Sequence, residues 1–139
     1  MPYVYFYIDK KDSQYNYIGI VKDARRLIYR IAEHEEREGL SIEDNVIHYV
    51  FTSTFSEADA LESDLINREN PRLNKAKKGW GVNNLLNFEK VMELVENEFD
   101  EDVLRRVIKD RSKTEALRFI DDDVLLGKKP LPFMYAIAR

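Results

Sequence analysis

The polar residues of this chain whose types and spacing could support chemistry lie in three segments. They are Tyr3-Val4-Tyr5 with Tyr17-Ile18-Gly19, then Arg30-Ile31-Ala32-Glu33-His34, and then residues 57–67 followed by Asn70-Pro71-Arg72-Leu73-Asn74. An arginine presents a rigid fork of donors to a phosphate and remains charged. A carboxylate can hold Mg²⁺, which keeps most of its waters and often needs only one or two protein ligands. These residue types suit hydrolysis of a phosphodiester bond, which needs an activated water and charge neutralisation at phosphorus.

In this order along the chain, the three segments resemble the GIY-YIG nuclease superfamily. That family includes the incision domain of a bacterial excision-repair nuclease, phage homing endonucleases and some restriction enzymes. The resemblance covers roughly residues 2–83. Its most specific part is Leu-Glu-x-x-Leu-Ile, beginning at Leu61, followed by Asn-Pro-x-Leu-Asn, ending at Asn74, which closely matches the excision-repair branch. Tyr17-Ile18-Gly19 and the spacing from Arg30 to His34 are weak signals when taken alone.

The resemblance implies a site and a mechanism. The catalytic residues that it implies are Tyr5, Tyr17, Arg30, His34, Glu62 and Asn74. Glu62 matches the family's single metal-binding glutamate, for Mg²⁺ or Mn²⁺, and Tyr5 matches the tyrosine that takes a proton from the attacking water. Tyrosine has a reference pKa of about 10, so this role requires surroundings that favour the phenolate. Tyr17 or His34 would orient the general base or relay its proton. The sequence leaves open which residue is the base and which one orients it.

Two features depart from the family pattern. Tyr3 stands where the first motif has a glycine, and a tyrosine there is expected to crowd the backbone near the site. The stretch between Gly19, which matches the glycine of the second motif, and Arg30 is a few residues longer than is usual. Because the residues assigned to chemistry are retained, the chain is interpreted as a member of a divergent subfamily.

Charge and composition limit the partners. The chain of 139 residues has a net charge of −4, which argues against a histone-like protein that binds nucleic acid by bulk charge. Local basic residues could still follow a DNA backbone, and those predicted to do so are Lys22, Arg25, Arg26, Arg72, Lys75 and Lys77. The absence of cysteine excludes a disulfide framework, a thiolate zinc site and a cysteine nucleophile. The sequence has neither a long apolar run nor a signal peptide, so a cytoplasmic protein that does not enter the membrane is expected.

The hydrophobic pattern predicts the elements that must position these residues. Residues 3–8 and 15–21 are predicted to form a strand hairpin, residues 23–38 a helix, residues 45–52 a third strand and residues 56–70 a second helix. The predicted N-caps are Asp23 and Ser56, the latter in a capping box with Asp59, and the predicted helix ends are Gly39 and Asn70-Pro71. In the first strand, Val4, Phe6 and Ile8 are assigned to the core, and Tyr3, Tyr5 and Tyr7 to the opposite face.

The expected fold is therefore α+β: a small three-stranded antiparallel sheet flanked by helices, as in the GIY-YIG nuclease fold, with a C-terminal helical extension. Residues 1–83 are assigned to the nuclease domain and residues 84–139 to the extension, with helices near residues 88–95, 103–108 and 116–120. The extension could bind DNA, dimerise the protein or complete the core. The run from Asp121 to Asp123 is interpreted as a solvated loop.

The sequence as a whole predicts a metal-dependent DNA endonuclease with a tyrosine general base. The alternatives are a catalytically silent domain that binds nucleic acid or protein, and a nuclease directed at RNA, because the motifs bind phosphate and both polymers contain it. A single site cuts one strand, so double-strand cleavage would need a homodimer or two binding events. Residue by residue, Arg30 could instead pair with Glu33 or Glu36, Asn74 could be a plain turn residue, and the tyrosines could be an aromatic face packed under the C-terminal helices.

Overall fold

The computed structural model describes residues 2–74, 98–109 and 119–131. In chain order the elements are β1 (Tyr3–Asp9), β2 (Tyr15–Val21), α1 (Ala24–Glu38), β3 (Asn45–Phe51), α2 (Phe55–Glu69), α4 (Glu101–Lys109) and α6 (Asp122–Leu125). The strands form one antiparallel sheet in the order β2-β1-β3. The predicted α+β class, with a three-stranded antiparallel sheet and flanking helices, is confirmed.

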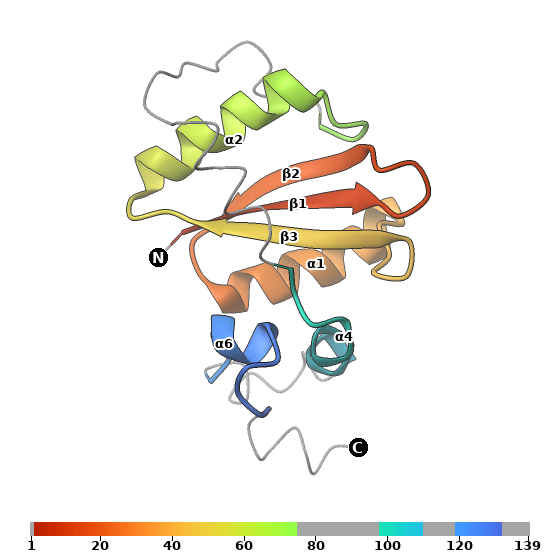
Figure 1. Ribbon diagram of the computed structural model, residues 1–139, viewed down its shortest axis with the longest axis vertical. Coiled ribbons are helices and arrows are strands. Elements are labelled where there is room, and N and C mark those ends of the chain that lie inside the picture. Colours follow the sequence, from red (N-terminus) through yellow and green to blue (C-terminus); the bar gives the residue numbers. More distant parts are fainter. Residues whose placement is uncertain (1, 75–97, 110–118, 132–139) are drawn as a thin grey trace.

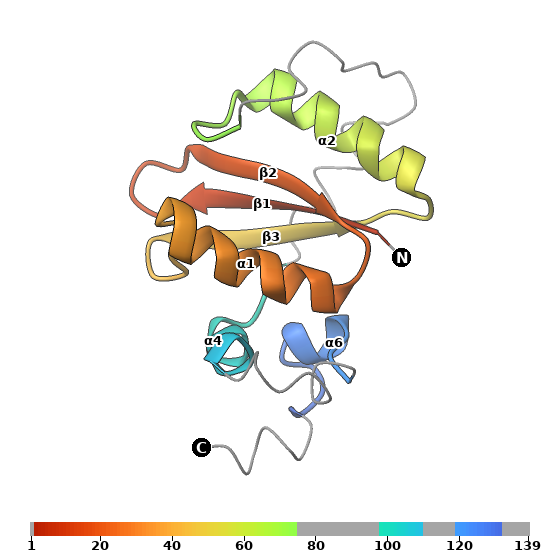
Figure 2. The same ribbon diagram turned by 180° about the vertical axis from the view of Figure 1, so that it is seen from behind.

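Helices cover both faces of this sheet (Figures 1 and 2). α2 lies on one face, and α1 lies on the other, with α4 and α6 on the same side as α1. Under α2, Val4 and Phe6 of β1 share a buried core with Leu61 and Leu65. This is the face of β1 that the sequence assigned to the core, although its third member, Ile8, is only half-buried.

The opposite face of β1 is buried as deeply. Tyr3, Tyr5 and Tyr7 belong to a second core on the side of α1, together with Leu27 and Ile31. The prediction of a single core face was therefore incomplete. β1 is the central strand of a sheet with a helical layer on each side, and such a strand has no solvated face.

α1 begins and ends where the sequence predicts. The side chain of its N-cap Asp23 accepts a hydrogen bond from the Arg26 N–H at 2.8 Å. Gly39 closes the helix with a φ of 70°, in the left-handed region that glycine enters at little cost. Asn70 ends α2 with a φ of 48°, also at the predicted position.

The predicted start of α2 is wrong by two residues. Thr54, not Ser56, is the N-cap, and its side chain accepts from the Glu57 N–H at 3.1 Å. Thr54 has the extended backbone of an N-cap, with φ −131° and ψ 159°. Ser56 already lies within the first turn of the helix, because Thr54 and Glu57 provide the capping spacing two residues earlier than Ser56 and Asp59.

The described part of the C-terminal extension completes the core on the tyrosine side. Phe99 stacks on Tyr49 with ring centroids 4.6 Å apart, and its N–H donates to the Ile47 carbonyl oxygen at 3.4 Å. The helix predicted near residues 103–108 is confirmed as α4, which packs against α1. The helix predicted near residues 88–95 and most of the one near 116–120 lie outside the described residues.

The interpretation of Asp121–Asp123 as a solvated loop is wrong. Asp121 is the N-cap of α6 and accepts from the Val124 N–H at 3.1 Å, and Asp122 and Asp123 form the first turn of that helix. Acidic residues are favourable at this end of a helix because its free N–H groups carry partial positive charge. In the three described ranges, no helix is both long enough and apolar enough to cross a bilayer.

Candidate active site

Tyr5 and Gly19 are paired across β1 and β2, and the contact between them is close. A methyl group on Gly19 would lie 2.6 Å from the Tyr5 hydroxyl oxygen and 2.9 Å from Cε2 of Tyr17. The ring centroids of Tyr5 and Tyr17 are 6.1 Å apart. Any side chain at position 19 would displace these two phenols, so the glycine allows them to meet on this part of the sheet.

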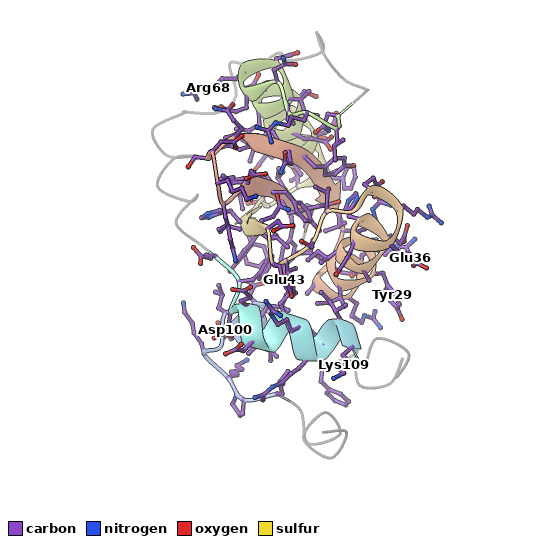
Figure 3. The ribbon with its side chains drawn as sticks, turned by 90° about the vertical axis from the view of Figure 1, so that its right-hand side faces the viewer. Tyr29, Glu36, Glu43, Arg68, Asp100 and Lys109 are labelled. Atoms are coloured by element: carbon purple, nitrogen blue, oxygen red, sulfur yellow. The ribbon has the colours of Figure 1, made fainter. Side chains whose placement is uncertain are left out.

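His34 brings α1 into the same cluster. Its side chain is 1% exposed, and its Nε2 lies 2.8 Å from the Tyr5 hydroxyl oxygen. Its ring centroid is 4.4 Å from that of Tyr17. On the outer side of the same helix, the exposed Glu36 points away from the sheet (Figure 3). The structure thus brings Tyr5, Tyr17 and His34 together, as the motifs imply.

Arg30 lies one turn before His34 on α1. Its Nη1 is 3.2 Å from Oε2 of Glu33, so the ion pair that the sequence offered as an alternative is present. Its positive charge also lowers the pKa of Tyr5, which places the guanidinium close to the phenols as well. The side chain is 38% exposed, so a phosphate can reach it from solvent.

The electrostatics of Tyr5 are opposite to those that the sequence analysis required. Burial raises the pKa of Tyr5 well above its usual range; Tyr17 and Glu62 raise it further, and Arg30 opposes the rise only in part. The protein's own groups therefore favour the phenol over the phenolate. Burial also lowers the pKa of His34. At neutral pH the site consists of a protonated phenol beside a neutral imidazole.

Glu62, the expected metal ligand, lies on α2 and hence on the other side of the sheet from α1 (Figure 1). The residue is 7% exposed, and its charge is felt at Tyr5, whose pKa it raises. A carboxylate fits Mg²⁺ or Mn²⁺, because hard cations prefer oxygen ligands and water or substrate oxygens can complete the shell. Among the described residues, no group of three or more His, Cys, Asp or Glu side chains could hold a metal ion. Glu62 is the carboxylate that the resemblance offers as the metal ligand.

Asn74 binds the backbone of β2. Its Nδ2 donates to the Ile18 carbonyl oxygen at 2.8 Å, and its Oδ1 accepts from the Ile18 N–H at 2.9 Å. β2 is at the edge of the sheet that the described residues form, so these bonds satisfy peptide groups between Tyr17 and Gly19 that no strand in the described ranges pairs. Asn74 therefore holds in place the strand that carries two site residues, which differs from both a catalytic role and a plain turn.

The predicted DNA-binding cations lie at opposite ends of β2. Those exposed where β2 leads into α1 are Lys22, Arg25 and Arg26. Arg72 lies at the other end, where its backbone N–H donates to the Tyr15 carbonyl oxygen and its guanidinium pairs with Asp9 and Asp12. Its partners make Arg72 a weaker candidate for a phosphate. Lys75 and Lys77 lie outside the described residues.

Two residues acquire roles that the sequence analysis missed. Tyr3, which departs from the glycine of the GIY-YIG pattern, donates its hydroxyl hydrogen to Asp122 of α6. Glu38 lies 3.2 Å from Nδ1 of His34 through its Oε2. Glu38 follows His34 by four residues, the spacing at which helical side chains meet, and this was the available signal.

Comparison with protein-family models, with curated proteins and with solved structures finds no match for this chain. An interpretation of its chemistry therefore depends on the ordered motifs and on the geometry around Tyr5. That geometry combines a phenol with a proton acceptor, His34, a cation that can bind phosphate, Arg30, and the charge of Glu62. Chemically, a phenol that is hydrogen-bonded to a proton acceptor can take a proton from a water molecule beside a bound phosphate.

Proposed function

We propose that the protein is a metal-dependent DNA endonuclease of the GIY-YIG type, which hydrolyses phosphodiester bonds with a single divalent ion. The observation that carries the proposal is the 2.8 Å hydrogen bond between Tyr5 and His34, formed against Gly19 and beside Arg30. These residues come from the first two of the three segments, and they form one cluster of side-chain types that suit phosphodiester hydrolysis.

Each side chain has one task in this proposal. Arg30 exchanges Glu33 for a phosphate oxygen and holds the scissile group, because its fork of donors suits phosphate. Tyr5 takes a proton from the water that attacks phosphorus, and Tyr17 orients that water. Glu62 would hold Mg²⁺ or Mn²⁺, and the ion, when bound, neutralises charge at phosphorus and on the leaving 3′ oxygen.

The proposed substrate is DNA, contacted through its backbone in the cytoplasm. Beyond the scissile phosphate, the exposed cations where β2 leads into α1 would bind the neighbouring phosphates; they are Lys22, Arg25 and Arg26. Contacts of this kind position a nucleic acid without reading its sequence. One site cuts one strand, so linear products from a plasmid would indicate a homodimer or two binding events.

A second candidate function is a catalytically silent domain that binds nucleic acid or protein. The observation that favours it is the burial of Tyr5, which is 1% exposed and whose raised pKa opposes the phenolate. This candidate predicts binding without cleavage, whereas the nuclease proposal predicts both. A preference for RNA is a third outcome of the same experiment.

The test is cleavage of supercoiled plasmid with Mg²⁺, with Mn²⁺ and with EDTA. It compares wild type with Glu62→Gln, which removes the charge but keeps the shape, and with Asp59→Asn as a matched control. Asp59 is an exposed carboxylate one turn earlier on α2. Metal-dependent nicking that Glu62→Gln abolishes and Asp59→Asn retains is the expected result.

The opposite results are equally informative. Cleavage that survives in Glu62→Gln at the wild-type rate would refute the metal assignment. Binding to duplex DNA, branched DNA and RNA with no cleavage of any of them would refute the nuclease proposal and support the silent domain. Cleavage of RNA alone would change the substrate and keep the chemistry.

A further inference from the structure

Three side chains form a continuous hydrogen-bonded chain from the surface of α1 to the phenol in the core. Oε2 of Glu38 is 3.2 Å from Nδ1 of His34, and Nε2 of His34 is 2.8 Å from the hydroxyl oxygen of Tyr5. His34 is 1% exposed, whereas the Glu38 side chain is 39% exposed. We call this arrangement the Glu38–His34–Tyr5 chain.

The two distances determine where the protons lie. An ionised carboxylate can only accept hydrogen bonds, so the contact with Glu38 requires the proton of the imidazole to be on Nδ1. Burial lowers the pKa of His34, so the ring is neutral near pH 7 and carries that single proton. Nε2 is then an acceptor, and the Tyr5 hydroxyl donates to it. The oxygen of Tyr5 remains able to accept a further proton.

We propose that Glu38 is a positioning residue that fixes the tautomer of His34, and that Tyr5 thereby acts as a neutral proton shuttle. This inference rests on the proposed nuclease function. As a water oxygen forms its bond to phosphorus, the proton of that water moves to the Tyr5 oxygen and the proton of Tyr5 moves to Nε2 of His34. The bond from phosphorus to the 3′ oxygen breaks, and the leaving oxygen keeps the electron pair and takes a proton from solvent. The imidazolium is stabilised by Glu38 until it returns its proton through Tyr5 to a solvent water, which restores the neutral imidazole.

The shuttle resolves a conflict within the site. A general base in the phenolate form would be scarce, because burial raises the pKa of Tyr5. A shuttle needs no phenolate, since Tyr5 gains one proton as it gives up another. The charge that develops falls on His34, which is the group that the Glu38 carboxylate faces.

An exposed ion pair between helical residues four positions apart contributes little stability by itself. Here the far side of the imidazole is bonded to a phenol 29 residues away, inside a cluster of site residues. The titratable groups around His34 are Tyr5 and Tyr7 from β1, Tyr17 from β2, and Arg30, Glu33 and Glu38 from α1. Glu38 is the one in this set that contacts Nδ1.

The first readout is the tautomer of His34, measured from imidazole ¹⁵N shifts in the full chain. The sequence has two histidines, so His48→Gln assigns the signals. Wild type is expected to show a protonated Nδ1 and an unprotonated Nε2. Glu38→Ala is expected to move the proton towards Nε2, and Glu35→Gln, an exposed carboxylate on the same helix, to leave it unchanged. A proton on Nε2 in wild type would overturn the proposal, whether or not the protein cleaves DNA.

The second readout is the rate of plasmid cleavage across pH. Glu38→Gln can still accept from Nδ1 but lacks the charge, so its cleavage rate is expected to fall by about 10-fold to 100-fold, and Glu38→Ala by more. Cleavage by both variants at the wild-type rate, with folding verified by circular dichroism, would overturn the role of Glu38 while keeping the nuclease. A wild-type protein with the inferred tautomer but no cleavage would instead refute the proposed function, and the shuttle with it.

Discussion

Gly19→Ala offers the sharpest test of how the site is packed. The new methyl group would lie 2.6 Å from the Tyr5 hydroxyl oxygen, 2.7 Å from Tyr5 Cζ and 2.9 Å from Tyr17 Cε2. All three separations are well below ordinary van der Waals contact, and the Tyr5 ring is fully enclosed. Overpacking of this kind costs about 1–3 kcal/mol. If Tyr5 moves and loses His34, a further 1–2 kcal/mol or so is lost with the buried hydrogen bond.

The expected total is about 2–5 kcal/mol, measured as a fall in the free energy of unfolding in urea. Gly39→Ala is the matched control. Among the described residues, none has an atom within 4 Å of a carbon added to Gly39, whose φ is +70°, so its substitution costs the left-handed backbone term, about 1–2 kcal/mol. Gly19 is needed because a side chain there would not fit, and Gly39 is needed because its backbone is left-handed.

A double-mutant cycle identifies the source of the cost. Tyr5→Phe removes the closest atom and the bond to His34, although Cζ remains in the way. The Gly19→Ala/Tyr5→Phe protein is therefore expected to be more stable than the sum of the single losses implies, by about 1 kcal/mol or more. Strict additivity, or a Gly19→Ala protein as stable as wild type, would refute the contact between Gly19 and Tyr5 on which the site is built.

Three further predictions concern substitutions of single residues. Burial lowers the pKa of His34 in the folded protein, so at low pH the unfolded chain binds this proton more readily than the folded one. The effect sets in below a pH of about 6.5, the reference pKa of histidine. Wild-type stability should therefore be full above that pH and fall below it, and His34→Gln should flatten this part of the stability–pH curve in urea titrations. Asn74→Ala should lose about 1–2 kcal/mol of stability and slow cleavage, because it frees both polar groups of Ile18; unchanged stability would contradict the strand-holding role. Arg26→Ala should weaken DNA binding and reduce its salt slope by about one, whereas Arg72→Ala, already paired with carboxylates, should do neither in the same salt titration.

The local parts of the fold could be predicted from the sequence. β2 spans the predicted residues, and Asp23 and Gly39 bound α1 as expected, because caps and strand composition act over a few residues. The start of α2 was misplaced because Thr54 and Ser56 both offer a capping hydroxyl, and only the backbone angles distinguish them. The two buried faces of β1 had a signal that was not used, since residues 3–8 carry no charge on either face, and such a run indicates cover on both sides.

The candidate site was predictable as a set of residues but not as a set of contacts. The motifs pointed to Tyr5, Tyr17, Arg30 and His34, which the structure brings together. The pKa of Tyr5 could not be foreseen, because it depends mainly on burial, which is a property of the assembled fold. The bonds from Asn74 to Ile18 join residues 56 positions apart, and no local pattern encodes such a pairing.

Tyr3 stands where the GIY-YIG pattern has a glycine, and the structure gives this departure a structural role. The Tyr3 hydroxyl is bonded to Asp122, and its ring packs against Tyr49 and Phe51 at centroid distances of 5.5 and 4.5 Å. Tyr3 therefore links β1 to α6 in the C-terminal extension. The contacts of Tyr5 with Gly19 and His34 are kept two residues further along the strand. Because Tyr3 attaches the extension, the absence of a glycine at this position does not by itself count against catalysis. The burial of Tyr5 counts against a phenolate base. A proton shuttle that needs no phenolate is the form of catalysis compatible with that burial.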